Sequence, residues 1–462
     1  MSTCLVSDKE LEDYVTGRLD PAAFRQLSRH LAAGCDRCDE RLAPFVEALF
    51  EKPLPDEPDE DDDDDDGGEG PSVYDEAIER AIRSVLREAP RLHRRKKRVS
   101  NLLSIVLAAP VDSDGRLNLA GIRPRLRPSG ELMEALIAAS QEMRFRDRKK
   151  MLDYAFLAQV GAHNLGDEDG PRALRADLEA RAWGELGNAY RLNDRFEAAE
   201  MALSSAAVLL DQGSGDILLL GHLLDLQASL RSSQRRLPEA LELLGHAERY
   251  YREAGDLHLA GKALIQKGIN TFYEGRAAEA VTLIRQGLAQ LEPGRDPRLL
   301  ALGQHDLLNA LVECGDYREA GEMLLSSGLG QAFAEDPVNL LRLRWVEGRI
   351  FAGKEKLGRA EGILQEVRDG FQARGMEYDA ALVGLELAGV WLQQGDKAAA
   401  VRDLAQEVRE IFEDLAVQGE ALRAVRHLEA ACRNEEATPS LTQKIVIFLR
   451  RLEWQPQLRF AA

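Results

Sequence analysis

The chain has 462 residues, of which 45% are hydrophobic and 6% aromatic, which suits two or three helical domains. Its formal net charge of −19 is mostly local: residues 51–70 carry twelve acids and one lysine, a net of −11, so the charge marks a linker and excludes a broad acidic binding face. The best apolar run, Leu102–Ala109, is far shorter than the roughly 20 residues of a membrane span, and no secretory signal opens the chain, so we expect a cytoplasmic protein without a membrane segment.

Residues 1–50 are expected to form a small module of three short helices. Ser7-Asp8-Lys9-Glu10 has the pattern of a capping box, in which the serine hydroxyl and the glutamate carboxylate bind free backbone N–H groups at a helix start. Asp20-Pro21 predicts the start of a second helix. A third helix is expected after the turn that holds Cys35 and Cys38.

The same fifty residues carry a candidate zinc site. Three thiolates and one imidazole form a closed tetrahedral zinc set, and the chain supplies them at Cys4, His30, Cys35 and Cys38. A module with so few apolar residues needs a further source of stability, which metal binding provides. The alternative is that Cys35 and Cys38 form a redox pair without metal.

This arrangement resembles the anti-sigma zinc-finger family of bacteria. The resemblance rests on Cys4, the phrase Leu11…Tyr14…Gly17, and His30…Cys35-x-x-Cys38, although four residues follow His30 where the family has three. It implies a module that binds an extracytoplasmic-function type sigma factor and holds it away from RNA polymerase core enzyme. In that family zinc is purely structural in some members and is lost on oxidation in others, and both cases stay open here.

Two charged segments follow. Residues 51–72, with the run Asp61–Asp66, are expected to be a disordered acidic linker, either a simple spacer or an imitation of nucleic acid toward a basic protein. Residues 73–130 are expected to be a basic connector, part helical and part irregular. Residues 91–150 hold fifteen basic and six acidic side chains, and the run 91–98 is their densest part. Their partner is nucleic acid, an acidic protein surface or, as we favour because the two opposite charges are adjacent, the chain's own acidic run. No DNA-reading motif is present, so specific base readout is not expected.

Residues 131–179 are expected to be a helical cap, and residues 180–415 carry a repeat. A similar six-residue phrase ends in alanine at a spacing of 41 and then four times 40 residues, at Ala199, Ala240, Ala280, Ala320, Ala360 and Ala400. A fixed period in this range indicates a solenoid of helix pairs. A plain bundle would not repeat its turn residues, and the glycines at 275, 315 and 395 interrupt the seam of a coiled coil.

The first unit resembles the tetratricopeptide repeat (TPR) family. It has Trp183, Leu186, Gly187 and Tyr190 ahead of Ala199, in the family's pattern. The period is longer than the usual 34 residues of that family. The resemblance implies a right-handed α-solenoid of about six helix pairs, whose concave face binds a peptide or a protein.

Residues 416–462 are expected to cap the array with one more helix pair, at 416–433 and 440–452. The apolar tail from Trp454 to Phe460 docks either on the array or on a partner. Cys314 and Cys432 lie at helical positions and are expected to be buried apolar residues.

The sequence therefore predicts an all-α, non-enzymatic protein, since no phosphate loop, nucleophile elbow or metalloprotease motif is present. We expect a bacterial regulator whose zinc finger sequesters a sigma factor while the TPR array binds a protein partner, with Zn²⁺ as its only cofactor and no nucleic acid bound. The alternative is a TPR scaffold with a purely structural zinc module. A third, weaker alternative is a redox sensor that uses Cys35 and Cys38.

Overall fold

The computed structural model describes residues 6–15, 27, 38, 41, 97, 99–106, 128–395 and 397–461. The chain divides into two compact units, Met1–Val85 and Leu86–Ala462. Every regular element of the described residues is a helix, which confirms the all-α expectation. None of the helices in this part of the chain is both long and apolar enough to cross a membrane. The predicted acidic linker and most of the predicted zinc module lie outside the described residues.

In the first unit, helix α1 (Asp8–Val15) begins with the expected capping box. The backbone N–H of Ser7 donates to Glu10 Oε2 over 2.7 Å, and the backbone N–H of Glu10 donates to Ser7 Oγ over 3.2 Å. These bonds hold the pKa of Glu10 below its ordinary value. Leu11 is fully buried, and Arg41 forms an ion pair of 2.5 Å with Asp8.

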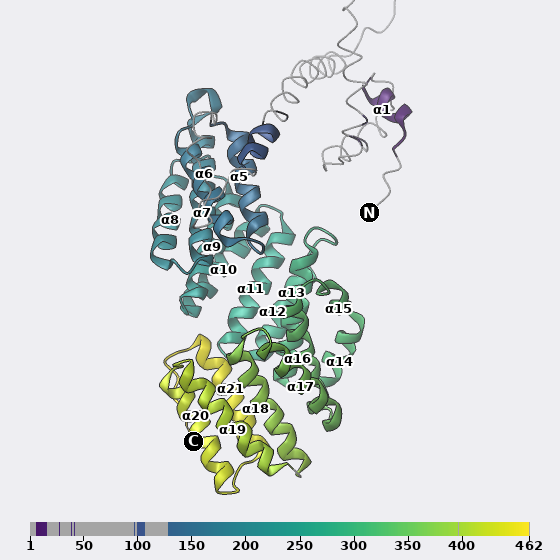
Figure 1. The fold of residues 1–462 in the computed structure, drawn as a ribbon. Coiled ribbons are helices and arrows are strands. Elements are labelled where there is room, and N and C mark those ends of the chain that lie inside the picture. The colour runs from purple at the N-terminus through teal and green to yellow at the C-terminus, as the bar shows by residue number, and fades with distance from the viewer. Residues whose placement is uncertain are drawn as a thin grey trace, which may run out of the picture. The chain divides into compact units, whose positions relative to one another are not determined.

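The second unit is a row of antiparallel helix pairs (Figure 1). It begins with α5 (Gly130–Met143) and α6 (Arg148–His163), and the helical residues 99–106 pack on their core through Val106. A single 3-10 turn, η2 (Asp167–Asp169), leads into the array.

Six pairs then follow, the fourth with a short extra helix, α15 (Leu329–Ala332). They are α7 (Arg172–Leu192) with α8 (Phe196–Leu210), α9 (Ile217–Ser233) with α10 (Leu237–Glu253), α11 (Leu257–Tyr273) with α12 (Ala277–Leu288), α13 (Pro297–Cys314) with α14 (Tyr317–Ser326), α16 (Pro337–Gly353) with α17 (Leu357–Gln372), and α18 (Glu377–Gln394) with α19 (Ala398–Asp414).

The turn inside every pair has the same backbone. Its first residue has a left-handed φ between 57° and 85° at Asp194, Arg235, Gly275, Gly315, Glu355 and Gly395. In the first five pairs, the next N–H bonds back to the carbonyl five residues earlier, as from Arg236 to Arg231 over 2.8 Å and from Lys356 to Phe351 over 2.9 Å. This is the Schellman ending of a helix, which favours glycine, so three of the six pairs accept a less favourable residue there.

The first helices of four pairs also start alike. Asp216, Asp256, Asp296 and Asp336 stand just before them, and each side chain accepts a backbone N–H from the first helical turn. An aspartate cap of this kind contributes about 1 kcal/mol to a helix. The caps and the turns together reproduce the 40-residue period in the backbone.

Small residues let the two helices of a pair approach closely. A Cβ added at Gly187 would lie 2.8 Å from Leu203 Cγ, and one added at Gly268 would lie 2.5 Å from Ile284 Cγ1. The repeated alanines at 199, 240, 280, 320 and 360 are fully buried. In the sixth pair the buried position falls on Val401, and Ala400 is only partly buried, because α19 starts one residue later than the period requires.

After the six pairs, α20 (Gly419–Arg433) continues the row by packing on α19. Helix α21 (Pro439–Trp454) turns back and packs mainly against α18, as Figure 1 shows in yellow beside green. The tail docks on the chain itself: Trp454 at its start stacks on Tyr273 of the array, and Phe460 is 4% exposed against Phe448 of α21. Cys432 is buried as expected, but the expectation for Cys314 was wrong: it is exposed, because it ends α13 at the turn.

Candidate functional site

Of the four predicted zinc ligands, Cys38 alone lies among the described residues, and it is fully buried. Cys4, His30 and Cys35 lie outside them, so the zinc site stays a prediction. A set of three thiolates and one imidazole has the donor chemistry of a closed zinc site. Elsewhere in the described part of the chain, no three His, Cys, Asp or Glu side chains gather as metal ligands would.

The TPR-signature residues lie in the packing between helices. Leu186 is 2% exposed, and Trp183 and Tyr190 are half-buried against the cores on both sides of α7. Gly187 crosses Ala199 closely, as described above. The structure therefore places these residues in the core of the first pair.

Polar and aromatic side chains gather on one face of the array, formed by the first helices of the pairs and named here the first-helix face. Helix α21 lies along the C-terminal part of this face. Its residues reach α18, α16, α13 and α11 in turn, through contacts with Glu386, Trp345, Glu313 and Tyr273.

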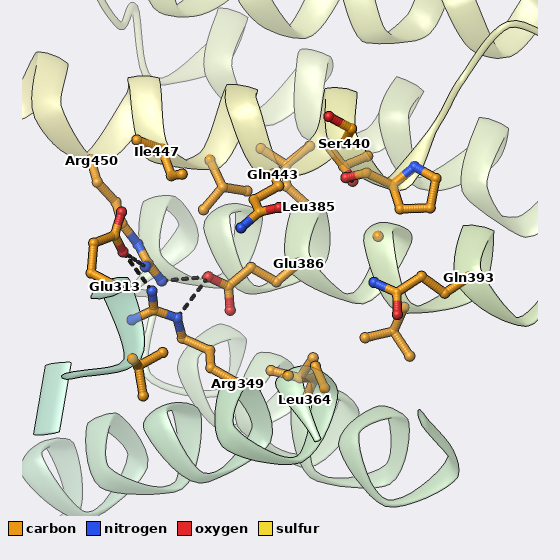
Figure 2. Close-up of a pocket in the computed structure, with 18 of the residues that line it drawn as sticks. Glu313, Arg349, Leu364, Leu385, Glu386, Gln393, Ser440, Gln443, Ile447 and Arg450 are labelled. Carbon is orange, nitrogen blue, oxygen red and sulfur yellow. Dashed lines mark hydrogen bonds and ion pairs between the residues drawn. The ribbon is translucent and has the colours of Figure 1, made fainter. Parts of the chain in front are cut away.

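At the centre of this contact, two arginines and two glutamates form a closed network (Figure 2). Arg450 of α21 contacts Glu386 over 2.5 Å and Glu313 over 3.8 Å. Arg349 contacts the same two carboxylates, over 3.4 Å and 2.8 Å. Burial and the neighbouring Arg349 lower the pKa of Arg450. The four charges sum to zero, and the network ties α21 to α13, α16 and α18.

A cavity of about 280 Å³ lies beside the network, between α13, α16, α18 and α21. Figure 2 shows Gln443 and Ser440 of α21 on one side of it and Gln393 of α18 near one end. The lining mixes the four charged side chains of the network with amides, hydroxyl groups and apolar side chains.

The C-terminal end of α21 is held by aromatic contacts. The ring of Trp454 stacks on Tyr273 with centroids 3.6 Å apart, and the guanidinium of Arg235 lies 4.1 Å from the ring centroid of Trp454. Gln455 Nε2 donates to the backbone carbonyl of Tyr273 over 2.8 Å. This end of α21 therefore reaches back to the second and third pairs.

Nearer the N-terminus, the first-helix face carries buried charges whose partners come from helices other than α21. The carboxylate of Glu185 lies 2.9 Å from His222 Nε2 and accepts from Gln141 over 2.7 Å. Burial raises the pKa of Glu185, but these bonds outweigh it, so the pKa lies below its ordinary value. Asp225 is likewise buried and pairs with Lys262 over 2.8 Å.

A second cavity, of about 500 Å³, opens beside these pairs. Its lining comes from the α5–α6 turn, α7, α9, α11 and the end of α21, and includes Arg144, Arg191, Gln266, Asn270 and Trp454. The pKa of Arg191 is lowered to about 10, first by burial and then by the neighbouring Arg144.

No known family model and no curated protein matches the chain. Solved structures resemble it in shape. A Rap protein complexed with competence and sporulation factor is 11% identical, with 71% of this chain and 93% of that chain covered and a TM-score of 0.49. Aspartyl phosphate phosphatase F from Bacillus subtilis is 11% identical, with coverages of 89% and 96% and a TM-score of 0.46. The TPR-like repeats of a kinesin light chain from Podosopora anserina are 16% identical, with coverages of 45% and 98% and a TM-score of 0.32. At these identities and TM-scores, the likeness says nothing of what this chain binds.

Sequence reasoning missed the polar residues of the first-helix face. Arg349, Glu386 and Arg450 are far apart in the sequence, and each is an ordinary helical residue in its own segment. One pattern was visible in the sequence: Glu185 and Glu386 occupy the same position of the repeat, in the first and the sixth pair. Such a signal reads as a solvated helix face until the tertiary contacts are known.

Proposed function

We propose that this chain is a non-catalytic adaptor that binds a partner protein on the first-helix face of its array. The observation that carries this proposal is the seat of α21, by which we mean the residues of the first-helix face that α21 contacts: Tyr273, Glu313, Trp345 and Glu386. The first-helix face already accommodates a helix, and it does so with charged and aromatic contacts on top of apolar ones. Helical solenoids commonly use an extended face of this kind for protein binding.

The proposal predicts that the face accepts a helix supplied from outside. A labelled synthetic peptide of residues 437–457 is titrated into the full chain and followed by fluorescence anisotropy. Wild-type chain should bind it weakly, because its own α21 occupies the seat. A full-chain variant that carries Arg450→Ala and Trp454→Ala should bind it at least tenfold more tightly, because its own helix holds the seat less firmly.

The matched control is a peptide that carries the same two substitutions, which should bind neither chain. Circular dichroism of the variant chain establishes that the array stays folded. Equal, weak binding of the wild-type peptide to both chains would show that the seat of α21 is a fixed part of the core. The proposed binding face would then lose its support.

A second candidate is regulation of a sigma factor by the N-terminal unit. Its support is the ligand pattern of Cys4, His30, Cys35 and Cys38, which resembles the anti-sigma zinc fingers. The zinc would hold the first fifty residues together, and the array would bind a protein that modulates the sigma factor. We expect the full chain to purify with one zinc per chain, and Cys38→Ser to lose the metal while the thermal transition of the array is unchanged.

Affinity purification from the native organism separates the two candidates. The full chain is compared with a chain that lacks residues 1–50. A sigma factor captured only by the full chain supports the regulatory candidate. The same partners on both baits, with no sigma factor among them, leave the adaptor and remove the sigma factor.

A further inference from the structure

The cavity at the N-terminal part of the first-helix face holds buried polar atoms that lack partners. The Nε atoms of Arg144 and Arg191 are buried and donate to nothing among the described residues. The amide oxygens of Gln266 and Asn270 are buried there too, and they accept nothing. A buried polar atom without a partner costs about 1–3 kcal/mol, so four around one cavity are costly unless something binds them.

Arg191 has hydrogen bonds, but none of them supplies a negative charge. Its Nη1 donates to Ser233 Oγ over 3.2 Å and its Nη2 to Asn188 Oδ1 over 2.8 Å. Neither Arg191 nor Arg144 forms an ion pair with a carboxylate of the described residues. The buried carboxylate of Asp225 pairs with Lys262 through Oδ2, and its Oδ1 has no partner among the described residues.

The third arginine of the cavity is also positioned by other groups. Arg235 lies over the ring of Trp454 and reaches Glu453 at 4.0 Å. Asp194, the one acidic residue of the lining, is exposed at the α7–α8 turn. The cavity wall therefore carries an excess of positive charge, concentrated on Arg144 and Arg191.

We propose that this cavity binds a carboxylate group of a peptide, which Arg144 and Arg191 would hold by charge-assisted hydrogen bonds. The flanking backbone N–H groups of the peptide would donate to the amide oxygens of Gln266 and Asn270. Planar guanidinium groups match a carboxylate well, and the two amide oxygens require donors. A phosphate ion at pH 7 offers mainly acceptors and would leave both oxygens without partners.

The inference rests on the proposed function and deepens it: the protein partner would present an acidic side chain or its C-terminal carboxylate to this cavity. The cavity is also placed where α21 ends, since Trp454 forms part of its wall. A bound peptide would therefore touch the end of α21, and the site extends the part of the face that α21 covers.

Calorimetric titration of the full chain at constant ionic strength tests the site. The probes are the acetylated and amidated tripeptide Ala-Glu-Ala, its glutamine counterpart Ala-Gln-Ala, and inorganic phosphate. The variants are Arg144→Met and Arg191→Met. The matched control is Arg318→Met, because the Arg318 side chain is 91% exposed on another helix.

We expect the glutamate peptide to bind wild type and the control at least tenfold more tightly than the glutamine peptide does, and each cavity variant to lose that preference. The melting temperature of the unliganded Arg191→Met chain should stay level or rise, because an unpaired buried cation is removed. A purely structural arginine would instead lower the melting temperature and leave peptide binding unchanged, which would overturn the proposal.

Two further outcomes also contradict it. Tight phosphate binding that Arg191→Met abolishes, with no peptide preference, would replace the peptide by an inorganic anion. Absence of binding by every probe would leave ordered water as the occupant. Affinity purification separates this inference from the function: partners captured equally by wild type and Arg191→Met keep the adaptor and remove the carboxylate site.

Discussion

At the C-terminal part of the first-helix face, Arg349 and Arg450 share Glu313 and Glu386, whereas at the N-terminal part Arg144 and Arg191 face a cavity without a carboxylate partner among the described residues. Each place has one arginine on the first helix of a pair, Arg349 on α16 or Arg191 on α7, and a second arginine from outside the pairs, Arg450 on α21 or Arg144 in the α5–α6 turn. The difference is that α21 covers the first place and closes its charges, while the second is left beside a cavity of about 500 Å³.

This difference separates two uses of buried charge. A network that the chain itself neutralises contributes position and specificity to the fold, at little net gain in stability. Buried charges that the chain leaves unpaired lower its stability, so their presence calls for an explanation such as a bound group that pairs with them. One end of the face is therefore closed by the chain itself and the other end is open, and four experiments test that difference.

The largest expected effect is at Glu386. Glu386→Ala removes the carboxylate that binds Arg349, Arg450 and the indole N–H of Trp345, the last over 2.6 Å. Two arginines would then lose half of their compensation, and we expect a loss of about 3 kcal/mol in the free energy of unfolding. Denaturant unfolding followed by circular dichroism measures it. A loss under about 1 kcal/mol would mean that water already solvates these charges.

Removal of the aromatic end of α21 should cost less. Trp454→Ala deletes the stack on Tyr273 and uncovers the face of Arg235. Because Trp454 is only half-buried, we expect about 2 kcal/mol rather than the full cost of a core tryptophan. Trp454→Phe should restore most of the stability, and a restored value no better than alanine would argue against stacking.

A substitution can supply the carboxylate that the cavity beside Arg144 and Arg191 lacks. Ser233→Asp places a carboxylate where Ser233 now accepts from Arg191. The new ion pair should raise stability by about 1 kcal/mol, after a small loss from placing an acid at the C-terminal end of α9. The same variant should no longer bind the glutamate tripeptide, since the internal carboxylate takes its place. Raised stability with unchanged peptide binding would separate Arg191 from the proposed site.

The smallest effect is a pH dependence at Glu185. Its pKa in the folded chain lies below the ordinary value, since hydrogen bonds from His222 and Gln141 outweigh its burial. The stability that these bonds contribute is therefore present above the ordinary glutamate pKa of about 4.3, and it is lost as the pH falls through the folded value. The unfolding free energy of Glu185→Gln should fall less steeply below pH 4 than that of wild type. Parallel curves would assign the acid sensitivity to other carboxylates, such as the buried Asp225.

Much of the array could be predicted from the sequence because its devices are local. The spacing of Ala199 to Ala360 predicted helix pairs, and the capping box at Ser7 predicted the start of α1, because a cap or a turn involves residues within one helical turn. The aspartate caps from Asp216 to Asp336 repeat at the same 40-residue interval, and that signal was present but unused. In the sixth pair, α19 starts one residue later than the period requires, so Val401 is buried in place of Ala400. No local pattern in the sequence indicates this shift.

The candidate sites could not be predicted in the same way. The period, the turns and the helical class each follow from neighbouring residues, so the sequence alone is enough to predict them. The return of α21 to α18 and the meeting of Arg144 and Arg191 at one cavity are visible only in the folded chain. The physical reason is that buried charge depends on which distant segments share a low-dielectric space, and helical periodicity carries no information about that.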